Sequence, residues 1–280
     1  MIKKEYFICI LLFLFACNSN KKQAAVFLEN AKELYERGEY TSAKNNLDSI
    51  KTLFPEEFGI QKQGLKLKRQ IEIKEHERNL NFCDSMLKLL LPKAETKKSG
   101  FLFEKKSEYD ETGKYIDKSQ LLEVKLQSSY IRTTVSEIGE IQLLSVYYGG
   151  RPIQHSRLKV SKSTGEYVET LDIPYDGGLN YSFVDGGMTT EVVTYTNGKD
   201  NGVIQYIYNN KESVLKAELS GKGKYAFTIS AADKKGLVKI VDFAVVLSDI
   251  DKMKKEKEKS SRRLKYLEDK LTTEPVLNEE

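Results

Sequence analysis

Apolar residues follow two different periods along the chain, and the changes of period divide it into three parts. In residues 23–91 they recur every three or four positions, which is typical of amphipathic helices. In residues 100–229 many segments alternate apolar with polar residues and are rich in β-branched and aromatic types, which is typical of strands. The helical period returns in residues 230–271. This succession predicts an α+β fold.

The first helical stretch has the spacing of two short helices joined by a turn at Gly38 and ended by Pro55. The expected contact positions are Phe27, Ala31, Leu34, Tyr40, Ala43, Leu47 and Ile50. The stretch AAVFLENAKELYERGEYTSAKNNLDSIKTLFPE resembles one tetratricopeptide repeat, although Asn30 stands where that family usually has an apolar residue. No second copy follows, and a solenoid needs about three. The resemblance therefore implies a single helical hairpin docked on another part of the protein.

Residues 56–91 predict one long helix that ends at Pro92. A three-four seam occupies its second half, at Ile73, His76, Leu80, Cys83, Leu87 and Leu90. His76 and Cys83 are conceivable metal ligands, with Glu72 one turn away. A structural zinc site needs four ligands, however, and the chain has no CxxC or HxxxH pair. We therefore interpret both residues as packing positions and expect no metal.

The middle of the chain contains six segments of strand composition separated by short turn sequences such as Gly139-Glu140 and Gly221-Lys222-Gly223. These segments are Tyr130–Ile138, Ile141–Tyr148, Glu191–Thr196, Val203–Tyr208, Val214–Leu219 and Tyr225–Ile229. Gaps this short join antiparallel strands but not parallel ones. We expect an antiparallel meander in the form of a curved sheet, a sandwich or a partly open barrel.

The segment LDIPYDGGLNYSFVDGGM repeats Asp-Gly-Gly nine residues apart. The repeated residues are Asp176, Gly177, Gly178, Asp185, Gly186 and Gly187. Glycine-aspartate nonapeptides bind calcium in longer arrays, but two copies without EF-hand spacing favour Asp-Gly turns. Because loops on a rigid sheet commonly carry function, these six residues are the candidate binding loop.

The last helix begins at Ser230, which has the position of an N-cap, with Asp233 three residues later. An apolar stripe follows at Phe243, Val246, Ile250 and Met253, is polar at Lys257 and Ser260, and resumes at Leu264, Leu267 and Leu271. We predict that this helix pairs antiparallel with the helix of residues 56–91, and that the polar gap makes the far end the weak part of the pair. The charged run KMKKEKEKSSRR is interpreted as a solvated face, with contact to anionic headgroups or a partner as the alternative.

The N-terminus reads MIKKEYFICILLFLFACNSN, a basic start followed by an apolar run too short to span a membrane comfortably. The tetrad Leu14-Phe15-Ala16-Cys17 resembles the lipobox of bacterial lipoproteins, with Phe15 bulkier than the usual residue. The resemblance implies that Cys17 is acylated and becomes the mature N-terminus; an uncleaved short anchor is the alternative. Several acyl chains would anchor the protein stably.

Composition and the absence of common motifs argue against several classes of function. A formal charge of +4 is small against 86 charged residues, and a nucleic-acid binder usually has a concentrated basic face, so we expect no nucleic-acid partner. Cys83 is the only cysteine beyond the N-terminal segment, which excludes a disulfide scaffold. His76 and His155 are the only histidines, and no GxSxG, HExxH or Walker A motif is present. The segment from Tyr147 to Arg151, before His155, is interpreted as aromatic packing at a strand end, with a small site as the alternative.

The expected architecture is α+β: an N-terminal helical hairpin plus a long helix, an antiparallel β-sheet domain and a long C-terminal helix. The predicted parts are a signal peptide (1–16), a lipidated tether (17–22), a helical region (23–92), a β domain (100–229), a C-terminal helix (230–271) and a flexible tail (272–280).

We expect a lipid-anchored protein of the bacterial cell envelope, in the outer rather than the inner membrane, although no residue distinguishes the two. Its expected role is structural or binding, within a membrane-associated assembly that it contacts through the helical region. The alternative is a ligand-binding module that captures a glycan or a peptide through loops of the β domain. We expect no cofactor and no enzymatic activity.

Overall fold

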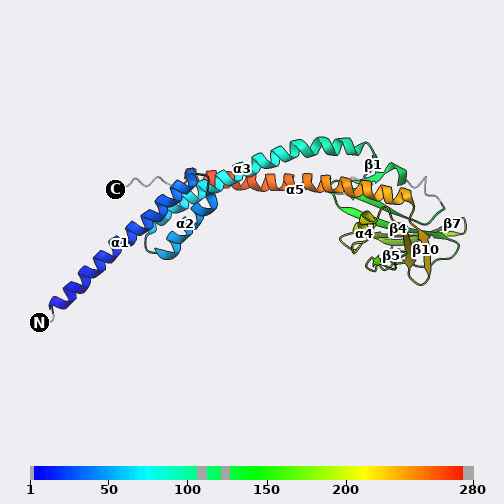
Figure 1. The fold of residues 1–280 in the computed structure, drawn as a ribbon, viewed down its shortest axis with the longest axis horizontal. Coiled ribbons are helices and arrows are strands. Elements are labelled where there is room, and N and C mark those ends of the chain that lie inside the picture. Colours follow the sequence, from blue (N-terminus) through cyan, green and yellow to red (C-terminus); the bar gives the residue numbers. More distant parts are fainter. Residues whose placement is uncertain (1–2, 106–111, 121–126, 274–280) are drawn as a thin grey trace. The chain divides into compact units, whose positions relative to one another are not determined.

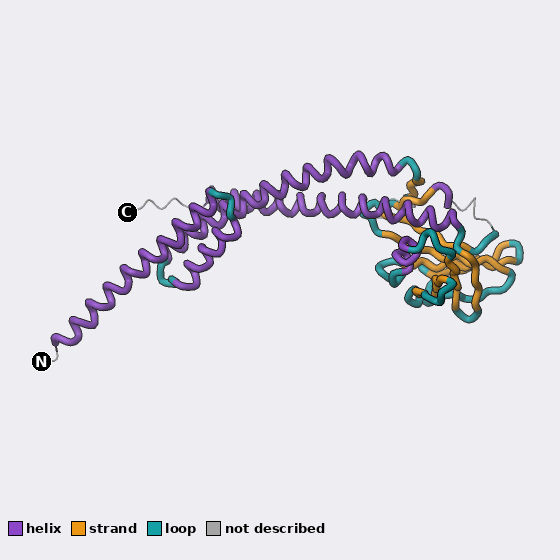
Figure 2. Tube along the Cα trace, viewed as in Figure 1, coloured by secondary structure: helices purple, strands orange, loops and turns teal. Residues whose placement is uncertain are grey.

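The computed structural model describes residues 3–105, 112–120 and 127–273, with side chains from residue 19 onward (Figures 1 and 2). The fold is α+β, as predicted, with five α-helices and two antiparallel sheets in the described residues. The chain divides into two compact units. A helical unit combines residues 1–85 with 254–280, and a β unit is formed by residues 86–253. The division passes through two long helices, α3 (Phe58–Lys98) and α5 (Ala231–Thr273), each of which contributes to both units.

The helical unit starts with two helices, α1 (Lys3–Glu36) and α2 (Tyr40–Leu53), which form the hairpin expected from the sequence. Gly38 turns the chain between them at φ +76°, a value that suits glycine. The buried core of the hairpin is Ala24, Leu28, Ala31, Ala43, Leu47, Ile50 and Phe54, and Ile60, Leu67 and Ile71 of α3 complete it. The start of α3 therefore covers the apolar side of the hairpin, while the tetratricopeptide resemblance itself stays a prediction.

Further along α3, the helical unit contains the antiparallel helix pair that the two stripes predict. Glu72 bonds Arg263, and Asp84 bonds Lys257, so α3 and α5 run in opposite directions here. Ser260, in the polar gap of the α5 stripe, is fully buried and accepts a hydrogen bond from Asn79 Nδ2 at 2.8 Å. Polar side chains of α3 therefore form hydrogen bonds with the polar gap of the α5 stripe.

The β unit contains ten strands in the described residues. They are β1 (Phe101–Glu104), β2 (Lys114–Asp117), β3 (Tyr130–Ser136), β4 (Ile141–Gly149), β5 (Arg157–Lys162), β6 (Tyr167–Glu169), β7 (Asn180–Asp185), β8 (Met188–Tyr195), β9 (Leu215–Ser220) and β10 (Lys224–Thr228). One sheet has the order β1-β2-β3-β4-β8-β7 and the other the order β10-β9-β5-β6, and every pairing is antiparallel.

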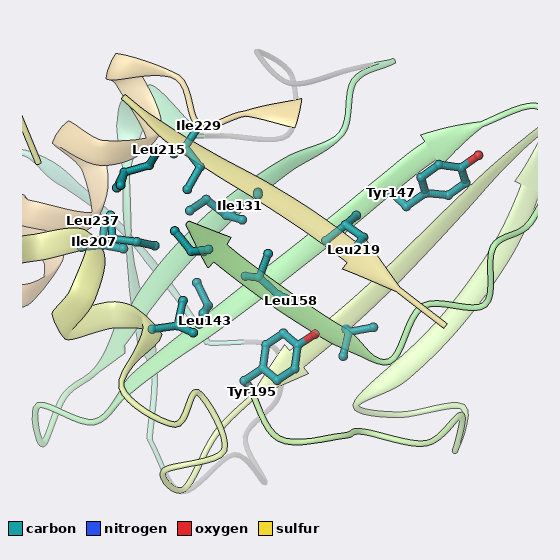
Figure 3. Packing of buried hydrophobic residues seen from close by; sticks show 14 of the residues in the cluster. Ile131, Leu143, Tyr147, Leu158, Tyr195, Ile207, Leu215, Leu219, Ile229 and Leu237 are labelled. Carbon is teal, nitrogen blue, oxygen red and sulfur yellow. The ribbon is translucent and has the colours of Figure 1, made fainter. Parts of the chain in front are cut away.

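Three apolar clusters stabilise the β unit, and the smallest of them is Tyr130, Val146 and Val192. The largest one contains Ile131, Leu143 and Tyr195 of the six-stranded sheet and Leu158 and Leu219 of the four-stranded sheet, whose side chains converge in Figure 3. The second one joins Ala94 of α3, Phe101, Tyr115 and Val135 of the sheet, and α5 from Ile240 to Ile250. Burial of this many large side chains, at about 1.5–3 kcal/mol each, is the main favourable contribution to folding.

The start of α5 agrees with its sequence signature, because Ser230 Oγ accepts a hydrogen bond from the Asp233 amide at 3.0 Å. Gly139, in the β3–β4 turn, lies against α5 at φ +84°. A Cβ there would lie 2.5 Å from Ser248 N and 2.6 Å from Ala244 O. Only glycine therefore allows this turn to approach the helix backbone.

Three predictions about secondary structure are wrong. The long helix does not end at Pro92 but continues to Lys98, where packing of Ala94 against the sheet outweighs a proline that costs about 3 kcal/mol. The segment 203–208 is not a strand but the helix α4 (Val203–Asn209), in which Val203 and Ile207 are buried one turn apart. The strand order is not a meander beyond β4, because β5 and β6 join the second sheet before β7 and β8 return to the first.

Among the residues that the structure describes, no helix combines the length and the apolar character needed to cross a membrane.

Candidate ligand site in the β unit

A cavity of about 600 Å³ opens between the two sheets of the β unit. Its walls are the corner before β5, the loop before β7, the strand β7 and the β9–β10 turn. The lining residues are Gln154, Ser156, Arg157, Asp172, Pro174, Tyr175, Asn180, Ser182, Glu191, Gly221 and Lys222. This volume lies within the range of about 300–1,000 Å³ that is usual for small-molecule sites.

At the floor of the cavity, the carboxylate of Glu191 holds the corner before β5. Its Oε1 accepts hydrogen bonds from the amides of Ile153 and Gln154, each at 2.7 Å, and its Oε2 accepts one from the His155 amide at 2.9 Å. Three successive amides that converge on one anion form a nest. Gln154 adopts φ +50°, a left-handed conformation that is uncommon for a side chain of this kind. The corner is thus shaped around Glu191.

The His155 ring extends this network into the core. Its Nδ1 lies 2.8 Å from Glu191 Oε2, and its Nε2 lies 3.0 Å from Ser145 Oγ. Tyr195 OH lies 3.4 Å from the same Ser145 oxygen. In the neutral ring, Nδ1 donates to the carboxylate and Nε2 accepts from the serine hydroxyl.

The order Ser145, His155, Glu191 is that of a nucleophile, a base and an orienting acid. Ser145 and His155 are nevertheless completely buried, and neither lines the cavity. A substrate carbonyl cannot reach Ser145 Oγ in this conformation. The network therefore stabilises the fold and positions the cavity floor.

The pKa values follow from this environment. Burial alone would raise the pKa of Glu191, but hydrogen bonds from the His155 ring and from the backbone amides of His155 and Gln154 outweigh it and hold that pKa below its ordinary value. Burial raises the pKa of Tyr195 to about 12, so its hydroxyl stays protonated. The network contains one stable negative charge, on Glu191.

The wall opposite Glu191 is held by Asn180 and by an ion pair. Asn180 Nδ2 donates to the carbonyl oxygens of His155 and Ile173, at 3.1 and 2.6 Å, and so ties the loop before β7 to the corner. Asp172 Oδ1 accepts hydrogen bonds from Ser156 Oγ at 2.6 Å and from Arg157 Nε at 3.2 Å. Tyr175 stands at the mouth with 69% of its surface exposed.

The six residues of the predicted binding loop form the two turns that flank β7. Asp176 Oδ1 accepts hydrogen bonds from the amides of Gly178 and Asn180, at 2.8 and 2.9 Å. Gly186 and Gly187 form the two-residue β7–β8 turn at φ +56° and +78°, between the paired residues Asp185 and Met188. Both Asp-Gly-Gly segments therefore act as turns, and none of the six lines the cavity. Their neighbours Pro174, Tyr175, Asn180 and Ser182 do.

The other residues singled out in the sequence lie elsewhere. Tyr147 OH donates to the Arg151 carbonyl at 2.8 Å, and its ring contacts Tyr225 edge-on at 5.3 Å, so this segment is aromatic packing. In the helical unit, His76 Nδ1 lies 3.2 Å from Ser260 Oγ, and Cys83 is fully buried. Among the described residues, no group of three His, Cys, Asp or Glu side chains is placed to hold a metal. The side chain of Cys17 and residues 274–280 of the predicted tail lie outside the described part.

Sequence reasoning missed Glu191, Asp172 and Lys222. One signal was present for Glu191: it alternates along the strand in step with the apolar residues Val193 and Tyr195, so it points into the core as they do.

No family model, no curated protein and no solved structure matches the chain.

Proposed function

We propose that the chain is a lipid-anchored protein of the bacterial cell envelope whose β unit binds a ligand. The observation that carries the binding role is the cavity between the two sheets, with its fixed floor and its exposed aromatic mouth. A cavity with a few convergent polar groups is the usual form of a ligand site. The anchoring role rests on the sequence pattern that ends at Cys17.

Lipid attachment is tested by feeding cells a fatty-acid analogue and recovering the full-length protein. The wild-type protein and a Cys9→Ser control should carry the label, because Cys17 is the expected acyl acceptor in both. Cys17→Ser should be exported without label. Equal labelling of Cys17→Ser would refute the lipid anchor.

The binding role is tested by blocking the cavity. Gly221 lies at its wall, and the Cβ of any other residue there would lie 1.9 Å from the Gln154 carbonyl oxygen, so that position disturbs the corner itself. Ser182→Trp instead adds bulk on the exposed wall and should leave the fold intact. Binding of glycan arrays and of displayed peptides should be lost in Ser182→Trp and kept in the control Thr228→Trp at an exposed end of β10.

A second candidate role is as a component of an envelope assembly, through the helical unit. Its hairpin and the start of α3 expose Val26, Leu53 and Phe58, at 58%, 59% and 72%. A contact surface of this kind requires the three side chains to form one contiguous apolar patch. Co-purification from detergent-solubilised envelopes should return the same proteins with wild type and with Val214→Ser, and fewer with Phe58→Ser.

A further inference from the structure

The strand β7 forms one edge of the six-stranded sheet, beside the cavity. Its six residues make it the longest of the four edge strands, compared with four in β1, five in β10 and three in β6. From Tyr181 to Asp185 every residue of β7 is exposed. A long exposed edge is the place where a sheet accepts another strand.

The register shows which backbone groups of β7 face outward. Thr194 N donates to Leu179 O at 2.7 Å, and the same register continues through Tyr181 with Val192 and Phe183 with Thr190. In an antiparallel pair, alternate residues exchange hydrogen bonds with the partner strand. The N–H and C=O groups of Ser182 and Val184 therefore point away from β8. Within the described part of the chain, no backbone group outside the sheet pairs with them.

Natural proteins protect such edges with lysine, proline or a bulge. β7 has the sequence NYSFVD and contains none of these, and its one charged residue is the last, Asp185. Phe183 is 51% exposed and Val184 is 70% exposed. Between Asn180 and Val184, β7 therefore has no charged side chain that would discourage pairing with another strand.

Ser182 of β7 lines the cavity. The cavity therefore lies on the face of the six-stranded sheet to which the Ser182 side chain points. Residues directly opposite each other on neighbouring strands point to the same face, so a strand added to β7 would direct alternate side chains toward the cavity. Backbone pairing with pockets for alternate side chains is the usual way in which a sheet edge recognises an extended peptide.

The charges of the lining favour an acidic side chain at that position. Asp172 is engaged by Arg157 and Ser156, and Glu191 by three amides and His155. The ion pairs at this end of the described unit are Arg157 with Asp172 and Glu218 with Lys159 and Lys224, and none includes Lys222. Among the charged lining residues, Lys222 therefore has no ion pair within the described part of the chain, so its charge is available to a ligand.

We propose that the ligand of the β unit is an extended peptide that adds to β7 as a seventh strand and places an acidic side chain in the cavity beside Lys222. This inference rests on the proposed binding role and specifies its ligand. The backbone pairing supplies affinity without sequence preference, and the cavity selects the acidic residue.

The probe is a display library of random heptapeptides, followed by fluorescence anisotropy with the selected peptides as synthetic, labelled compounds. The full-length protein in detergent should select strand-forming sequences with Asp or Glu at one position. Lys222→Glu should weaken their binding about tenfold or more, as expected when attraction between two charges becomes repulsion. Lys216→Glu, at the opposite end of β9, is the matched control and should bind as wild type does.

Backbone pairing is tested independently by Val184→Pro, which removes an outward N–H and leaves the bonds to β8 in place. Binding should again fall about tenfold or more. Because a proline variant can fail to fold, the same point is tested from the ligand side. Replacing successive peptide residues by proline should abolish binding at alternate positions, as strand pairing requires.

The outcomes separate the inference from the proposed function. Binding of glycans alone, lost in Ser182→Trp, would overturn the peptide inference and keep the binding role. Peptide binding that is unchanged in both Val184→Pro and the proline scan would also overturn it. Self-association of wild type that Val184→Pro abolishes would assign the edge to a second copy instead. Absence of any binding would overturn both proposals.

Discussion

His155 Nδ1 and Glu191 Oε2 lie 2.8 Å apart, and both side chains are almost completely excluded from solvent. Glu191 is on β8 of the six-stranded sheet, and His155 lies in the corner that leads into β5 of the four-stranded sheet. The pair connects the two sheets at the floor of the cavity, so its loss should affect stability and the shape of the cavity together.

Glu191→Ala should therefore destabilise the protein strongly. It leaves three amides and the His155 ring without their common acceptor, and each buried donor left unsatisfied costs about 1–3 kcal/mol. Urea unfolding at neutral pH measures the change. Glu166→Ala, which removes a carboxylate that is 65% exposed, is the control and should cost about 0.5 kcal/mol or less. Similar losses in both variants would contradict the role assigned to Glu191.

The same carboxylate should make stability depend on pH. Its pKa in the folded protein is lower than the ordinary 4.5, so its contribution is complete above that pH and is lost as the pH falls through the folded value. Wild type should lose stability as acid is added below about pH 5, and Glu191→Gln should lose less over the same interval. Parallel curves of unfolding free energy against pH would show that Glu191 is not responsible. Other carboxylates with lowered pKa, such as Asp117, contribute equally to both proteins and cancel in the difference.

Two glycine substitutions separate steric overlap from backbone strain. Gly139 and Gly165 have similar φ, +84° and +91°, but a Cβ at Gly139 would overlap the α5 backbone whereas one at Gly165 would meet nothing within 4 Å. Gly165→Ala should cost about 1–2 kcal/mol, from strain alone. Gly139→Ala should cost clearly more, because the turn must move away from α5. Thermal unfolding measured by circular dichroism compares the two, and equal costs would mean that the close approach of turn and helix does not matter.

The polar layer of the helical unit should be coupled across its two helices. Asn79→Ala leaves Ser260 buried without its best donor and should cost about 1–2 kcal/mol, whereas Asn81→Ala, at an exposed position of the same helix, should cost nothing or stabilise slightly. A double-mutant cycle of Asn79→Ala with Ser260→Ala should give a coupling energy of about 0.5–1.5 kcal/mol. A coupling near zero would show that the two side chains act independently.

Truncation after Met253 should leave the β unit folded. All the α5 residues in its core lie between Leu237 and Ile250, so the truncated chain keeps its apolar clusters. The helical unit would lose Ser260 and Leu267, which are buried in it. The expected result is a cooperative melt of the sheet signal with reduced helix content. Collapse of the sheet signal would place the last turns of α5 in the core of the β unit.

The helices were predictable because their signals are local. The stripe from Phe243 to Leu271 fixes which side of α5 is buried, and Ser230 marks where α5 begins. The segment VIQYIYN was wrongly predicted as a strand for the same reason, because its β-branched and aromatic residues locally favour one. It forms the helix α4 because a helix buries both Val203 and Ile207 in the core.

The cavity and its lining were not predictable in the same way. Glu191 and His155 are 36 residues apart and meet because β8 pairs with β4 while β5 crosses to the other sheet. No periodic pattern records that crossing. The predicted Asp-Gly-Gly residues lie next to the cavity because they bound β7, while other side chains of the same segment line it; that this segment binds a ligand stays a prediction.

The helical unit is built from two stretches of chain that are separated by the whole β unit. Asn79 and Ser260 are 181 residues apart, so the order of folding is constrained. A disordered connection of that length would impose a large closure entropy on the α3–α5 pair. A folded β unit removes most of this cost, because it holds the two helices where they leave the sheet. We therefore expect the β unit to fold first, as a continuous segment, and the helical unit to close last, once the end of the chain has emerged. A substitution that weakens the sheet core would then also slow closure of helices that it never touches.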